Sequence, residues 1–101
     1  AIELVALPPV LCLQLLRFVY DVASNSKKKI SAAIGFPERL DLSSFLPHDC
    51  MPHGDPGCAQ YQLTAVLMHT GSSANSGHYT ARILDQATAN DETQRWLSFN
   101  D

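Results

Sequence analysis

The sequence predicts an α+β fold that is dominated by antiparallel strands and contains one short helix. The segment 61–69 is the clearest strand, because every second residue from Tyr61 to His69 falls on one face and the polar Gln62 and Thr64 fall on the other, and 78–84 is predicted as another strand. Short segments of small or polar residues lie between the predicted strands and suit hairpin connections. With 101 residues, the chain is long enough for one domain or a piece of one.

The first half of the chain is expected to hold a hairpin and the short helix. The run Val10–Tyr20 is apolar on both faces at its centre, which is typical of a strand buried on both sides. A polar turn and three lysines occupy 21–29, and 30–34 is the expected return strand. Asp41 is a candidate N-cap for one or two helical turns, which Pro47 ends.

The second half is expected to end in a hairpin of two strands. The segment 47–60 is predicted to be a long loop, because it holds three prolines and two glycines. The elements expected after it are a strand at 61–69, a loop of small residues at 70–77, a strand at 78–84, a polar turn at 85–93 and a strand at 95–100.

Composition and charge argue against several classes of protein. Hydrophobic residues make up 46% of the chain, which indicates a globular protein, and the net charge of −3 disfavours a nucleic-acid partner. The longest apolar run, Val10–Leu16, is far shorter than the roughly 20 residues that cross a bilayer, so no membrane association is expected. Three cysteines are too few for a disulfide scaffold, and no secretory signal is recognisable. We therefore expect an intracellular protein of the cytoplasm, the nucleus or both.

The last two predicted strands bring together two residues suited to catalysis. In an antiparallel hairpin, paired residues have numbers that sum to a constant, and a connection centred near Ala89 gives about 178. His78 then faces Asn100, and the amide oxygen could accept a hydrogen bond from the imidazole and fix its tautomer. Such a pair is the base and the orienting group of a nucleophilic triad. Asp101 would point to the other face unless the strand bulges, and the alternative interpretation is a surface hairpin with an incidental histidine.

Three blocks of sequence carry a resemblance to a known family. They are Leu-Pro-Pro-Val-Leu-Cys-Leu-Gln-Leu-Leu-Arg-Phe at 7–18, a histidine box at 61–79 that ends in Ser-Gly-His-Tyr, and Trp-Leu-Ser-Phe-Asn-Asp at 96–101. In this order, with the connecting segment 35–42 between the first two, they resemble the C-terminal half of the catalytic domain of the ubiquitin-specific proteases, a large family of cysteine deubiquitinases. The resemblance covers nearly the whole chain.

The resemblance implies a fold and an activity. Residues 1–101 would be the palm portion of a papain-like cysteine protease fold, a partial domain without thumb and fingers that begins and ends within elements of a longer chain. The parent protein would cleave the isopeptide bond after the C-terminal glycine of ubiquitin, with ubiquitin and ubiquitinated proteins as partners and without a cofactor. The cysteine box that carries the nucleophile would lie N-terminal to this chain, so the isolated chain is expected to be inactive.

The resemblance also implies roles for single residues. His78 would be the general base, Asn100 would orient its imidazole, and Asp101 would be a second acidic position that assists. Gly77 and Tyr79 would line the narrow channel that receives the ubiquitin tail, where a glycine lets two backbones approach closely. The alternative is a non-catalytic ubiquitin-binding module or an inactive relative.

Other Cys and His residues are expected to have no part in the chemistry. Cys12 lies within the apolar run and is expected to pack in a core, where a thiol is inert. His69 ends a predicted strand on its apolar face and is expected to be a structural or channel-side residue. A small zinc-binding domain is a further alternative, but the spacing of the only Cys/His cluster matches no common zinc pattern, and no metal site is expected. That cluster consists of His48, Cys50, His53 and Cys58.

Overall fold

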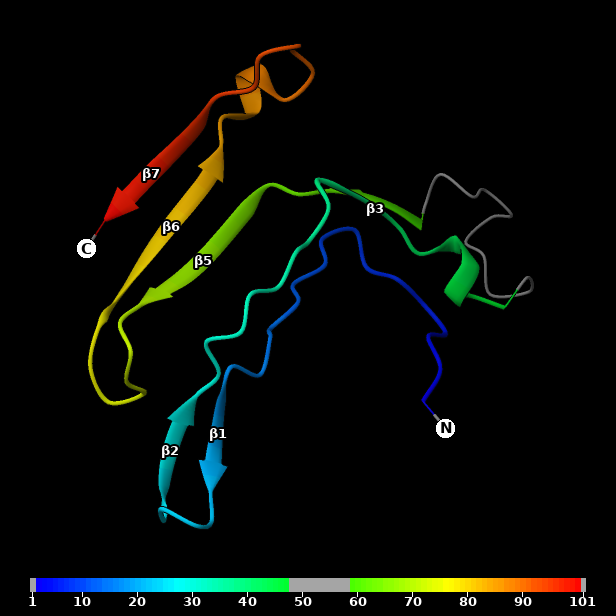
Figure 1. The fold of residues 1–101 in the computed structure, drawn as a ribbon. Coiled ribbons are helices and arrows are strands. Elements are labelled where there is room, and N and C mark those ends of the chain that lie inside the picture. The colour runs from blue at the N-terminus through cyan, green and yellow to red at the C-terminus, as the bar shows by residue number, and fades with distance from the viewer. Residues whose placement is uncertain (1, 48–58, 101) are drawn as a thin grey trace. The chain divides into compact units, whose positions relative to one another are not determined.

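The computed structural model describes residues 2–47 and 59–100 (Figure 1). It divides into two compact units: unit 1 comprises residues 1–14 and 36–63, and unit 2 comprises residues 15–35 and 64–101. The expected dominance of antiparallel strands is confirmed, because every strand pair in the described ranges is antiparallel. In place of the one short helix, the same ranges contain two 3₁₀ turns. None of the described helical segments is long and apolar enough to cross a membrane.

Unit 1 is built around a short strand pair. Strands β3 (Arg39–Asp41) and β4 (Gln60–Gln62) pair antiparallel, and the 3₁₀ turn η1 (Ser43–Phe45) follows β3. The backbone N–H of Ser43 donates to the Asp41 carboxylate at 2.9 Å, which holds the pKa of Asp41 below its ordinary value. The N-cap of η1 is Leu42 and not Asp41 as predicted, although the Asp41 carboxylate accepts from the first residue of the turn. A single 3₁₀ turn forms where one or two helical turns were predicted.

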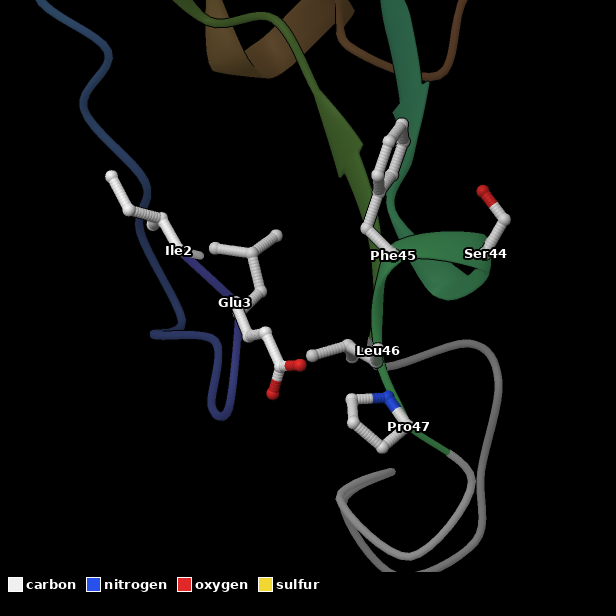
Figure 2. Close-up of a pocket in the computed structure, with 7 residues that line it drawn as sticks. Ile2, Glu3, Ser44, Phe45, Leu46 and Pro47 are labelled. Carbon is white, nitrogen blue, oxygen red and sulfur yellow. The ribbon is translucent and has the colours of Figure 1, made fainter.

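Unit 1 has a small core and a surface pocket. Leu46 and Ala59 are its buried apolar residues among those described. The hydroxyl of Tyr61 donates to the carbonyl of Pro8 at 2.5 Å and so ties the N-terminal segment to β4. That segment and η1 border a pocket of about 310 Å³ (Figure 2). Its lining residues are Ile2, Glu3, Leu4, Ser44, Phe45, Leu46 and Pro47.

Unit 2 begins with a hairpin that differs from the prediction. Strands β1 (Phe18–Asp21) and β2 (Ser26–Lys29) pair antiparallel. The strand predicted over Val10–Tyr20 is therefore wrong except at its C-terminal end. The return strand expected at 30–34 is also wrong, because the lysine run forms β2 instead of belonging to the turn.

The turn sets the position of this hairpin. The Asp21 carboxylate accepts hydrogen bonds from the N–H of Ala23 at 3.1 Å and the hydroxyl of Ser24 at 3.0 Å. Asn25 adopts the left-handed conformation with a φ of 52°, which asparagine tolerates better than most residues. Because the turn ends at Asn25, the lysines at 27–29 follow it directly and pair with β1. The apolar run at 10–17 has no partner strand among the described residues, and a strand depends on its neighbours for stability.

The main sheet of unit 2 has three strands. β5 (Ala65–Thr70), β6 (His78–Leu84) and β7 (Trp96–Asn100) form an antiparallel sheet in the order β5-β6-β7 (Figure 1). The strands predicted at 78–84 and 95–100 are thereby confirmed. Leu84, at the end of β6, is fully buried with 1% of its surface exposed.

The strand predicted over 61–69 is divided between β4 and β5. The Leu63 N–H donates to the carbonyl of Glu38 at 2.7 Å within unit 1, whereas the Thr64 carbonyl accepts from the Leu84 N–H at 2.8 Å within unit 2. The alternation of side chains continues through this point, but the backbone hydrogen bonds change partner. One sequence pattern therefore serves two sheets.

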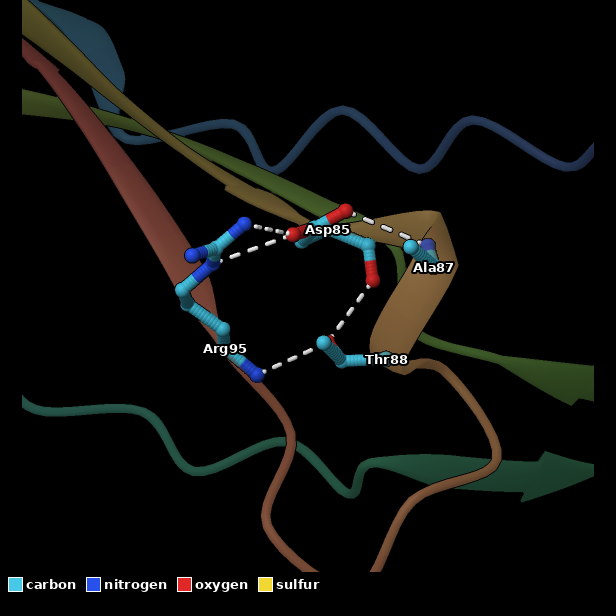
Figure 3. Close-up of polar contacts among 4 residues, drawn as sticks. All are labelled: Asp85, Ala87, Thr88 and Arg95. Carbon is cyan, nitrogen blue, oxygen red and sulfur yellow. Dashed lines mark hydrogen bonds and ion pairs between the residues drawn. The ribbon is translucent and has the colours of Figure 1, made fainter.

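The connection between β6 and β7 is held by a compact polar cluster (Figure 3). After Asp85 the chain forms the 3₁₀ turn η5 (Gln86–Thr88), and the Asp85 carboxylate accepts from the Ala87 N–H at 3.1 Å and from Nε of Arg95 at 3.0 Å. The Thr88 hydroxyl donates to the Asp85 carbonyl at 2.8 Å and accepts from the Arg95 N–H at 2.9 Å. The Arg95 guanidinium, and then the Ala87 N–H, hold the pKa of Asp85 below its ordinary value. This cluster joins the ends of the two strands and defines how they pair.

Candidate functional site

The predicted base lies at the start of β6, directly after a glycine that the backbone requires. Gly77 has a φ of 122°, a conformation that residues other than glycine rarely adopt. A Cβ atom on Gly77 would stand 2.2 Å from the carbonyl oxygen of Thr70, where no side-chain atom fits. The chain therefore enters β6 along a narrowly defined path, and the side chain of His78 is exposed at the beginning of the strand.

The pairing of β6 with β7 differs from the predicted one by two residues. Asn100 lies opposite Thr80, so the expected pairing of His78 with Asn100 is wrong. The connection centres one residue later than Ala89, because the turn η5 and the polar cluster around it shape it. Sequence alone shows this connection as a polar turn and does not reveal where its centre lies.

His78 and Asn100 nevertheless lie on the same face of the sheet. His78 is two residues before Thr80, which faces Asn100, and side chains point to the same face at every second residue. The two residues are diagonal neighbours, a placement with Cβ atoms about 7 Å apart that long side chains still bridge. Both are exposed, and thus accessible to a partner group. Asp101, the second candidate for the orienting role, lies outside the described residues.

The opposite face carries Tyr79, which is paired with His69 of β5. The two rings meet at a centroid distance of 5.1 Å and an interplanar angle of 63°, and 51% of the Tyr79 surface is exposed. Nε2 of His69 lies 2.9 Å from the place where a Cβ on Gly77 would stand. Both residues predicted to line a channel, Gly77 and Tyr79, therefore lie against the same imidazole ring.

Sequence reasoning missed two contacts that the β1–β2 hairpin makes with this region. The Phe18 ring of β1 meets the His69 ring at a centroid distance of 5.1 Å and an angle of 82°. The Lys29 ammonium of β2 donates to the carbonyl of His69 at 3.3 Å and to that of Gly71. No local signal predicts contacts between segments so distant in the chain, and the lysine run reads locally as a solvated turn.

Neither Cys12 nor a metal-binding cluster among the described residues adds a chemical group to this site. Cys12 is exposed, so its expected place in a core is wrong, because the run that holds it forms no strand in the described chain. The described residues include no group of three or more His, Cys, Asp and Glu side chains that could hold a metal ion. The Cys/His cluster of residues 48–58 lies outside them.

Comparison with known proteins shows the family to which this chain belongs. The sequence profile of the family described as ubiquitin carboxyl-terminal hydrolase matches residues 1–101. The chain therefore belongs to this family, and the resemblance to ubiquitin-specific proteases is confirmed.

Individual relatives with the name of this family align with nearly all of the chain. Ubiquitin carboxyl-terminal hydrolase 48 of Danio rerio is 46% identical over 100 residues, and the protein of the same name from Rattus norvegicus is 43% identical over 100 residues. Ubiquitin carboxyl-terminal hydrolase 26 of Oryza sativa subsp. japonica is 39% identical over 100 residues. Each alignment covers 99% of this chain but only 8% or 9% of the relative. The chain thus spans less than a tenth of the length of these curated relatives.

Proposed function

We propose that this chain is part of the catalytic domain of a cysteine-type deubiquitinase that hydrolyses the isopeptide bond after the C-terminal glycine of ubiquitin. The observation that carries the proposal is the exposed His78 at the start of β6, on the same sheet face as Asn100 of β7. Membership of the ubiquitin carboxyl-terminal hydrolase family supports the substrate class. The proposed partners are ubiquitin and ubiquitinated proteins inside the cell, and the mechanism uses no cofactor.

In this mechanism His78 moves a proton in both halves of the reaction. Its imidazole accepts the proton of a cysteine thiol, and the thiolate attacks the carbonyl carbon of the last ubiquitin glycine. The tetrahedral intermediate collapses when His78 donates the proton to the leaving lysine amine, and a thioester remains. Water then attacks the thioester while His78 accepts its proton, and the proton returns to the thiolate as ubiquitin leaves. Asn100 orients the imidazole by accepting a hydrogen bond from its other nitrogen, and Asp101 is the second candidate for this role.

Gly77 and Tyr79 are the proposed walls of the channel for the ubiquitin tail. A substrate backbone that ends in two glycines can lie against an enzyme backbone where no Cβ intervenes. Gly77 is the residue of this site without a Cβ, and its φ of 122° and its closeness to the Thr70 carbonyl require a glycine there. The half-exposed ring of Tyr79 follows two residues later in the chain and supplies an aromatic surface beside it.

An open apolar face of the sheet supports the proposal that these residues are a partial domain. The strand pairing places one apolar residue beside another across β5, β6 and β7 on the face opposite His78. The exposed members of this face are Leu67, Tyr79, Ile83, Leu97 and Phe99. Folded domains rarely leave a contiguous apolar face uncovered. We therefore place residues 1–101 in the palm of a papain-like cysteine protease fold, with the nucleophilic cysteine in a part of the protein outside these residues.

The test uses the full-length protein that contains these residues and ubiquitin with a C-terminal electrophile. We expect an adduct one ubiquitin heavier, mapped by peptide analysis to a cysteine outside this chain, and no adduct on the isolated chain. His78→Ala should slow adduct formation by about 10²–10⁴-fold, the range typical of a lost general base. Asn100→Ala should slow it less, and a double change of Asn100 and Asp101 should slow it further if Asp101 assists.

Other outcomes would contradict parts of this proposal. An adduct on Cys12, Cys50 or Cys58 would place the nucleophile within the chain. Ubiquitin binding without an adduct would identify a non-catalytic ubiquitin-binding module. Equal losses for the single and double changes at Asn100 and Asp101 would remove Asp101 from the mechanism.

A further inference from the structure

His69 is a partly buried polar residue that the proposed mechanism leaves unused. Its Nδ1 atom is buried and has no hydrogen-bond partner in the part of the chain that the structure describes, and such atoms are uncommon enough to need a physical reason. We propose that His69 is a positioning residue, whose ring fixes the glycine turn from which His78 enters β6. This inference rests on the proposed role of His78 as the general base.

Two aromatic rings contact the ring of His69, and a lysine ammonium donates to its backbone carbonyl. Phe18 contacts it at an interplanar angle of 82° and Tyr79 at an angle of 63°, both with centroids 5.1 Å apart. These are edge-to-face arrangements, which aromatic rings prefer over direct stacking. The ammonium of Lys29 donates to the His69 carbonyl at 3.3 Å. Side chains of β1, β2 and β6 thus determine where this residue of β5 lies.

The free edge of the ring supports the turn before β6. Nε2 and Cε1 of His69 lie 2.9 Å and 3.1 Å from the position of a Cβ on Gly77, and the carbonyl oxygen of Thr70 lies 2.2 Å from the same position. The backbone oxygen of Thr70 and the imidazole of His69 therefore both occupy the space into which a side chain at Gly77 would extend. His78 is the next residue, so a displacement of the ring would be passed directly to the backbone that carries the base.

We expect the site to use the edge contacts of the His69 ring and not its Nδ1 atom. Nδ1 of His69 gains nothing from hydrogen bonding in the described chain, and a buried polar atom without a partner destabilises the folded state. A phenyl ring would make the same edge contacts with Phe18 and Tyr79. We therefore expect phenylalanine at position 69 to position the turn as His69 does, whereas alanine would remove the ring that lies against Gly77.

The kinetic test compares these two variants in the full-length protein with a ubiquitin C-terminal fluorophore as substrate. We expect His69→Ala to lower kcat by about 10- to 100-fold, because a displacement of about 1 Å of a catalytic group has an effect of this size. KM should rise by a smaller factor, because the proposed channel residues Gly77 and Tyr79 lie against the same ring, and His69→Phe should retain most of kcat. Lys28→Ala is the control, since it shortens an exposed charged side chain of β2 next to Lys29, and it should leave kcat unchanged. Wild-type kcat in His69→Ala, or equal losses in both His69 variants, would overturn the proposal.

Hydrogen exchange separates this inference from the proposed function. In His69→Ala, amides over 70–80 should exchange faster than in the wild type, while those over 84–96 should not change. In His69→Phe both ranges should match the wild type. If the wild-type protein hydrolyses nothing, the proposed function fails and exchange alone decides whether His69 positions the turn. Unchanged exchange over 70–80, or faster exchange over both ranges in His69→Ala, would contradict a local positioning role.

Discussion

The glycine before His78 provides a direct test of the site geometry. Replacing Gly77 by alanine requires an L-residue to hold a φ of 122°, and a residue other than glycine is destabilised there by about 1–3 kcal/mol. The new methyl group would stand 2.2 Å from the Thr70 carbonyl oxygen and 2.9 Å from Nε2 of His69. Backbone shifts that relieve such an overlap cost about 1–3 kcal/mol more. The expected loss of local stability where β5 and β6 meet is therefore about 2–6 kcal/mol.

Hydrogen exchange in the full-length protein measures this loss. Even the lower limit of about 2 kcal/mol corresponds to exchange roughly 30-fold faster over residues 70–80 in Gly77→Ala. Gly35→Ala is the matched control, because Gly35 has no positive φ and no atom within 4 Å of its Cβ position. Alanine there restricts mainly the unfolded chain, so exchange should be unchanged or slightly slower. Wild-type exchange in Gly77→Ala would refute the claim that the backbone requires glycine before His78.

The sheet and its connection provide three further tests. The Arg95 guanidinium holds the pKa of Asp85 below its ordinary value of 3.8, so this carboxylate stabilises the connection fully above its unfolded pKa and loses that effect as pH falls through the lower folded pKa. The thermal unfolding temperature of Asp85→Asn should accordingly depend less on pH below about 4 than that of the wild type does. The same pH dependence in both proteins would contradict this. Leu84→Ala should destabilise the β6–β7 pair by about 2–5 kcal/mol because Leu84 is buried. Ser98→Ala, at an exposed polar side chain of β7, should change amide exchange in that pair little, and equal effects of the two changes would show that burial does not determine the stability of this pair. Asn100→Asp keeps an acceptor and should retain most of kcat, while Asn100→Ala should lose about 10- to 100-fold; equal kcat values would show that the acceptor at this position is dispensable.

The strands that carry the candidate site could be predicted because their limits are local. Gly77 marks the start of β6 by its conformation, and Asp85 marks its end by starting the connection with its own carboxylate. Between these two residues the alternation of side chains is regular, so propensity and pattern agree. The same agreement holds for β7, whose Trp96–Asn100 pairing with β6 follows the expected alternation.

The hairpin β1–β2 could not be placed in this way, because a strand needs a partner as well as a pattern. The run Val10–Leu16 has the stronger apolar pattern, yet it pairs with no strand in the described ranges. The weaker segment Phe18–Asp21 pairs because a turn that ends at Asn25 brings the lysines of 27–29 beside it. The contact of this hairpin with His69 depends on that pairing, and so it was beyond local prediction as well.

The error in the β6–β7 pairing shows which part of a site prediction is robust. Side-chain direction repeats every two residues, so a shift of two leaves His78 and Asn100 on one face and only increases the distance between them. A shift of one would have put them on opposite faces and removed any relation between imidazole and amide. The polar cluster of Asp85 and Arg95 determines the shift, and it does so through bonds that a polar turn in the sequence does not reveal. Because Asn100 is paired with Thr80 and not with His78, the proposed orienting hydrogen bond requires the Asn100 side chain to extend along the strand direction toward His78.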